Sequence, residues 1–228
     1  MDFSPFETRI GHTFTDKHLL ESAFTHRSYL NENRAHGREH NERLEFLGDA
    51  VLELVVTEFL YAKYPDKPEG DLTAYRAALV NTISISDCAV KLGMNEFLLL
   101  SRGESKDIGR ARQIILANAF EALIGAIYLD QGYQPARDFI SKQLFAKTDE
   151  VVEKKLWQDA KSKFQEVAQE LLGITPSYKL VDQSGPDHDK KFIIGAYIGP
   201  AKIASGEGKS KQEAEQDAAQ KALNVKGW

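Results

Sequence analysis

Apolar residues recur at helical spacing through the first two thirds of the chain. Steps of three and four predict a helix from about residue 42 to 61 and a second, almost wholly apolar helix over 114–129. The shorter patterns between and around them are also helical, while Pro65 and Pro68 end the first of these helices. Residues 1–148 are therefore predicted to form an all-α domain.

The period changes after a polar segment at 149–156, which we interpret as a linker that is partly helical. Residues 157–226 then predict a second domain, in which helices and short strands follow one another in the order α-β-β-β-α. The expected elements are a helix at 161–172, strands at 177–182, 190–198 and 201–205, and a helix at 209–223. This order implies a small α+β domain, a three-stranded antiparallel sheet with two helices on one face.

The helix from residue 42 carries an acidic stripe. Its acids are spaced 3, 4 and 4 residues apart, so they share one helical face. The residues concerned are Glu42, Glu45, Asp49 and Glu53, opposite an apolar stripe of Leu44, Leu47, Val51, Leu54 and Val55. A solvated face of an ordinary amphipathic helix is one interpretation. Like charges repel at this spacing, however, and carboxylates are the ligands that Mg²⁺ prefers, so a metal site is the other.

Gly48 lies in the middle of this helix, where glycine costs roughly 1 kcal/mol relative to alanine. Such a glycine commonly marks the close approach of another element. The apolar helix over 114–129 offers a partner, because its only polar side chains before Tyr128 are Asn118 and Glu121, three residues apart on one face. A buried Glu121 must be neutral, paired or bound to a metal. With an acidic stripe available to face it, a shared metal is favoured.

Composition adds limits to this picture. The net charge is −5, yet residues 156–228 hold ten basic and ten acidic side chains, so the acid excess lies in the predicted helical domain. The single Cys88 excludes an internal disulfide and is expected in the core. No basic region followed by an apolar run opens the chain, and no stretch of 18 uncharged apolar residues occurs. We therefore expect a cytoplasmic protein with no membrane partner.

A polar stretch at 101–113 precedes the second acidic helix. It contains Arg102, Lys106, Arg110 and Arg112 together with two glycines. It is interpreted either as a mobile loop or as a flexible arm that contacts phosphates.

Four motifs of the first domain resemble the ribonuclease III family. Residues 41–49, NERLEFLGD, are similar to its signature, and residues 117–129 to its second catalytic segment. Residues 25–29, THRSY, resemble its N-terminal motif, and residues 69–72 with 76–80 resemble the motif in between.

The second domain resembles a double-stranded-RNA-binding domain over its whole length. The matching positions that can contact RNA are Gln165 and His188, suited to 2′-hydroxyls, and Lys209 and Lys211 at a helix N-terminus, suited to phosphate. Gln212 and Glu215 depart from the more basic last helix of many such domains.

The resemblance implies an endoribonuclease that hydrolyses phosphodiester bonds in double-stranded RNA. It leaves 5′-phosphate and 3′-hydroxyl ends with a short 3′ overhang, as in the processing of rRNA and mRNA precursors. It implies Mg²⁺, with Mn²⁺ as a substitute, and no small-molecule cofactor. The implied metal ligands are Glu45, Asp49, Asn118 and Glu121, of which Asp49 and Glu121 are catalytic, with Glu42 and Glu69 as outer acids.

The resemblance also implies a homodimer, in which Phe46 enters the partner subunit. A core position for Phe46 within one subunit is the alternative. Many members of the family have Asp where this chain has Asn118, which brings one negative charge fewer. The rival function is therefore a non-catalytic RNA-binding regulator with a weakened metal site.

Overall fold

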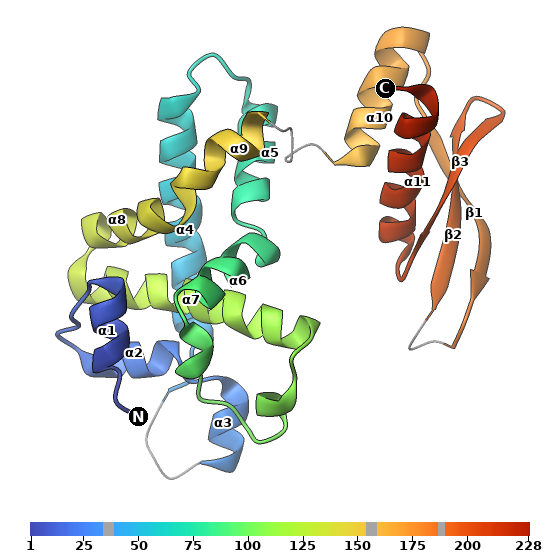
Figure 1. Cartoon of the computed structure of the whole chain (residues 1–228). Coiled ribbons are helices and arrows are strands. Elements are labelled where there is room, and N and C mark those ends of the chain that lie inside the picture. Colours follow the sequence, from blue (N-terminus) through green and yellow to red (C-terminus); the bar gives the residue numbers. More distant parts are fainter. Residues whose placement is uncertain (34–38, 154–158, 187–189) are drawn as a thin grey trace. The chain divides into compact units, whose positions relative to one another are not determined.

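Two compact units, Met1–Trp157 and Gln158–Trp228, make up the computed structural model, which describes residues 1–33, 39–153, 159–186 and 190–228 (Figure 1). The first unit is helical, as predicted. Its helices are α1 (Ser4–Ile10), α2 (Lys17–Ala23), α3 (Arg27–Glu32), α4 (Glu42–Lys63), α5 (Glu69–Leu79), α6 (Thr82–Lys91), α7 (Arg110–Gln131), α8 (Tyr133–Leu144) and α9 (Thr148–Glu153), with 3-10 turns η2 (Met94–Glu96), η3 (Glu104–Lys106) and η4 (Phe145–Lys147).

Helix α7 runs through the core of the first unit. Eleven of its 22 residues are buried. The helix carries apolar side chains on nearly all of its faces, as expected of a helix inside a core. By length and composition α7 is the one described helix that could cross a membrane, but its burial inside this unit identifies it as a core helix. Helix α4 packs against α7, and Figure 1 shows the two helices crossing.

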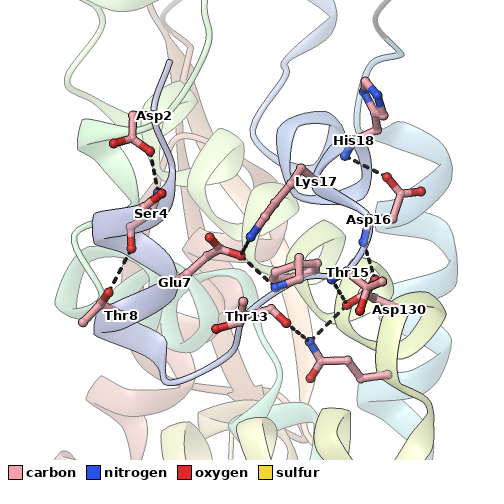
Figure 2. A network of polar contacts seen from close by, with 12 residues as sticks. Asp2, Ser4, Glu7, Thr8, Thr13, Thr15, Asp16, Lys17, His18 and Asp130 are labelled. Atoms are coloured by element: carbon pink, nitrogen blue, oxygen red, sulfur yellow. Dashed lines mark hydrogen bonds and ion pairs between the residues drawn. The ribbon is translucent and has the colours of Figure 1, made fainter.

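Polar contacts fix the N-terminal segment to the end of α7 (Figure 2). The carboxylate of Asp130 accepts hydrogen bonds from the backbone N–H groups of Thr15 and Asp16, at 3.0 and 2.8 Å. The buried Glu7 accepts the N–H of Phe14 at 2.7 Å and pairs with the ammonium of Lys17 at 2.6 Å. The segment before residue 16 is therefore part of the helical core.

The predicted linker begins inside a helix. Residues 149–153 belong to α9, which packs against α5 while its Val151 and Val152 lie against the main core. Asp149 pairs with Lys63 at the end of α4 and accepts a hydrogen bond from the hydroxyl of Tyr64. Along the described residues, the ordered helical unit thus extends five residues past the predicted boundary at 148.

The second unit has the predicted α-β-β-β-α order. Its elements are α10 (Ala160–Leu172), β1 (Ser177–Ser184), β2 (Lys191–Ile198), β3 (Ala201–Gly208) and α11 (Lys211–Lys226). The antiparallel sheet has the order β1-β2-β3, and α11 packs on β2, β3 and α10. Strand β3 runs three residues further than expected, and α11 begins two residues later because Ser210 caps it.

Two glycines allow α11 to lie close to β3. A Cβ atom at Gly206 would stand 2.0 Å from the backbone nitrogen of Ala218, and one at Gly208 would stand 2.5 Å from that of Ala214. Alanines fill the facing side of α11 for the same reason. Alanines predominate in the core of this small unit, where they pack with Phe164, Ile198 and Leu223.

Candidate active site

Two glycines bring the acidic helices α4 and α7 into backbone contact. A Cβ atom at Gly48 would stand 1.7 Å from the carbonyl oxygen of Glu121, and one at Gly125 would stand 2.3 Å from that of Leu44. Neither position can hold a side chain unless the helices separate. The close approach predicted from Gly48 is confirmed. Gly125 was missed, although a glycine within an apolar helix is the same signal.

The crossing gathers the four predicted metal ligands. The amide of Asn118 hydrogen-bonds the carboxylate of Glu45, while Asp49 and Glu45 both act electrostatically on Glu121. Glu45, Asn118 and Glu121 are half-buried, whereas Asp49 is exposed. The site is therefore a set of oxygens with one solvent-facing side.

The crowding of these acids raises the pKa values of two of them. Burial, reinforced by the charges of Asp49 and Glu45, raises the pKa of Glu121 to about 7. Burial also raises the pKa of Glu45, with Glu42 and Asp49 adding to the effect and the Asn118 hydrogen bond opposing it. Within the described part of the chain, Asn118 alone favours the ionised form of either carboxylate.

The donor types fit a hard divalent cation. Three carboxylates and one amide carbonyl supply only oxygen, which is what Mg²⁺ takes. Among the described residues, no group of three or more His, Cys, Asp or Glu side chains is already arranged to hold an ion.

The two predicted outer acids differ in position. Glu42 begins α4, contacts Arg27 at 3.7 Å and His40 at 3.8 Å, and acts on Glu45 electrostatically. Glu69 begins α5 and lines a separate groove of about 400 Å³ with Leu60 and Tyr61, near the other end of α4. Since a helix rises 1.5 Å per residue, about 16 Å of α4 separates Asp49 from Leu60. Within one chain, Glu69 does not join the cluster.

Phe46 is not a core residue of the subunit, because 81 % of its surface is exposed. It borders a hollow of about 610 Å³ whose apolar lining includes Leu19, Leu47 and Leu129. A protruding ring and a hollow therefore lie side by side on one surface. Leu54, expected on the buried stripe of α4, is 51 % exposed instead.

The expected RNA contacts of the second unit lie on its surface where they are described. Gln165 is exposed on α10, while Lys209 and Lys211 flank the Ser210 cap of α11 and are also exposed. His188 lies outside the described residues. The ammonium of Lys161, at the start of α10, forms an ion pair with Glu215 of α11 at 2.6 Å.

Both units are similar to known protein families. A family model described as ribonuclease-III-like matches residues 16–148, and one described as a double-stranded RNA binding motif matches 160–226. Ribonuclease 3 of Desulforamulus reducens is 47% identical over 95% of this chain and 88% of its own length. Ribonuclease 3 of Bdellovibrio bacteriovorus is 42% identical over 96% and 94%.

The fold is matched as well. The nuclease domain of a ribonuclease III from Campylobacter jejuni is 41% identical, with a TM-score of 0.56, over 62% of this chain and 98% of that domain. In that nuclease domain, a region involved in dimer formation shows structural flexibility. The motifs, the two units and the near full-length similarity agree: the chain belongs to the ribonuclease III family of double-stranded-RNA endoribonucleases, which use a divalent metal ion.

Proposed function

We propose that the chain cleaves double-stranded RNA with Mg²⁺ held by Glu45, Asp49, Asn118 and Glu121. The observation that carries this is the convergence of these side chains at the glycine crossing, where the pKa of Glu121 rises to about 7. Carboxylates whose pKa values are raised by burial and by each other's charges are typical of a functional site rather than of a solvated surface. Mn²⁺, with the same preference for oxygen, is the expected substitute.

The proposed ligands differ in burial, and we assign their roles accordingly. Glu121 and Glu45, which are half-buried, would hold the ion, and Asp49, which is exposed to solvent, would complete its ligand set and lie open to the substrate. A divalent ion bound here supplies an activated water and stabilises charge on the phosphate and the leaving 3′ oxygen. We assign Asp49 and Glu121 as the catalytic pair, giving 5′-phosphate and 3′-hydroxyl ends with a short 3′ overhang. Glu42 serves as the outer acid, and Glu69 would act from outside the cluster.

RNA binding is assigned to the second unit. Gln165, His188, Lys209 and Lys211 would contact the 2′-hydroxyls and phosphates of A-form RNA. Its balance of ten basic and ten acidic residues is modest for this task, so binding would depend on several weak contacts. We place this activity in the cytoplasm, in the processing of ribosomal and messenger RNA precursors.

The direct test is cleavage of a labelled duplex, with a single strand of the same sequence as control. Cleavage with Mg²⁺ or Mn²⁺, its loss with EDTA, and products that a ligase joins through their 5′-phosphates would support the proposal. Tight duplex binding without cleavage under any metal would instead identify the rival function, a binding regulator.

Asn118→Asp adds a ligand charge and removes the amide that hydrogen-bonds Glu45. We expect half-maximal cleavage at a several-fold lower Mg²⁺ concentration. Without metal, the extra like charge should lower the melting temperature at pH 8, which Mg²⁺ should restore. An Mg²⁺ dependence that is unchanged or weaker would show that position 118 is not a ligand.

The exposed ring and adjacent hollow suit a two-fold dimer. In such a dimer each surface meets its own copy, so Phe46 of each subunit can fill the hollow of the other. Phe46→Ala removes two anchors per dimer and should raise the dimer dissociation constant at least about tenfold. Sedimentation at low concentration measures this, with Ile83→Ala, 63% exposed on α6, as the matched control. Equal effects of both variants would exclude Phe46 as an anchor.

A further inference from the structure

Arg112 holds three backbone carbonyls of the loop that precedes α7. Its guanidinium donates to the carbonyl oxygens of Asp107 at 2.9 Å, Glu104 at 2.8 Å and Ser105 at 2.9 Å. Arg112 lies in the first turn of α7, where a cation is disfavoured by the helix dipole. The planar fork of arginine can hold several acceptors at once, which accounts for this residue type.

The other end of this loop is fixed to α3. The N–H of Ser101 donates to the hydroxyl of Ser28 at 3.1 Å, and the N–H of Arg102 donates to Glu32 at 3.2 Å. Figure 1 shows α3 beside the turn that contains η3. Residues 101–109, which we call the pinned loop, are therefore held by hydrogen bonds at both ends.

The pinned loop lies near the outer edge of the acidic cluster. His26, which also contacts the Ser28 hydroxyl at 2.8 Å, interacts electrostatically with Glu104 and Arg112 and with Glu42 of the acidic stripe. Along α7, Arg112 is six residues before Asn118, about 9 Å at 1.5 Å per residue. Arg102 and Lys106 are exposed on the same loop.

We propose that Arg112 is a positioning residue for cleavage, which keeps the pinned loop rigid so that Arg102 and Lys106 meet the RNA duplex at a fixed distance from the carboxylate cluster. This rests on the proposed function and assigns the loop a part in choosing which phosphate is cut. Two cations on a rigid loop bind the phosphates of the RNA backbone in one register, whereas cations on a loose loop can bind them in several registers.

Arg112→Lys keeps the charge but loses the fork that spans the three carbonyls. We expect the fraction of cuts at the main phosphate of a defined duplex to fall, with new cuts at neighbouring phosphates, and kcat to fall about tenfold. The duplex dissociation constant should change less than twofold. Trypsin should also cut after Arg102 and Lys106 faster than in the wild type, a readout that does not depend on activity.

Arg137→Lys is the matched control, because it makes the same change at an exposed position of α8. If Arg112→Lys does not fold, Ser28→Ala loosens the opposite end of the pinned loop and should scatter the cuts in the same way. Cuts at wild-type positions with wild-type kcat in the folded variant would overturn the positioning role alone. A wild type that cuts no duplex would overturn the proposed function and this inference together.

Discussion

Glu121→Gln should abolish most cleavage while making the metal-free protein more stable. The ligand charge is lost, so transition-state stabilisation falls, and we expect kcat to drop at least about a hundredfold. Duplex binding should persist within about twofold, because it depends on phosphate and groove contacts elsewhere. A filter-binding assay with a matched cleavage time course measures both. Near-normal turnover by this variant would remove Glu121 from the catalytic pair.

The gain in stability has a defined pH dependence. Burial and the charges of Asp49 and Glu45 raise the pKa of folded Glu121 to about 7, above its ordinary value of 4.5. The folded state therefore holds this proton more tightly than the unfolded state, and stability falls as pH rises from about 4.5 to about 7. The loss is complete above pH 7, where we expect about 1–2 kcal/mol after allowing for partial solvent exposure.

Glutamine has the same shape without the charge, so it should recover that stability at pH 8 and change little at pH 4.5. Urea unfolding in EDTA at the two pH values measures the difference. Adding Mg²⁺ should stabilise the wild type more than Glu121→Gln, since binding to the folded state alone adds stability by mass action. An equal gain at both pH values would contradict the electrostatic explanation.

Gly48→Ala should damage both the fold and the site. The new Cβ atom would stand 1.7 Å from the carbonyl oxygen of Glu121 and 2.9 Å from the backbone nitrogen of Gly125, and neither can move without moving a helix. Alanine gains about 1 kcal/mol in helix propensity, but overpacking two backbones costs more, so we expect a net loss of about 2–4 kcal/mol. The cleavage rate per molecule of folded protein should also fall, because the ligands on α4 and α7 are pushed apart.

Gly70→Ala is the matched control for this variant. Gly70 is also helical, on α5, and a Cβ atom there has no neighbour within 4 Å. It should leave melting temperature and cleavage unchanged or slightly raise stability. If both alanine variants melted like the wild type, α4 and α7 would not cross as closely as described.

Much of this site could be predicted because local chemistry determines it. Three signals can be seen within a few residues of sequence. They are the spacing of the acids on α4, the two polar residues on α7, and Gly48 in the middle of a helix. Glu69 and Leu54 could not be placed in this way, because their positions depend on where α5 lies and on what covers α4 in an assembly. Arg112 looked like one more surface cation, since its partners are backbone carbonyls that no residue pattern reveals.

The polar attachment of the N-terminal segment determines where the nuclease domain can be truncated. The family match begins at residue 16, yet Phe6 and Phe14 are buried before that point, and Asp130 and Glu7 depend on backbone donors between residues 14 and 16. An expression fragment cut at the edge of the family match would expose part of the core and leave the end of α7 without its partners. The smallest independently folding nuclease fragment of this chain therefore begins ahead of Phe6.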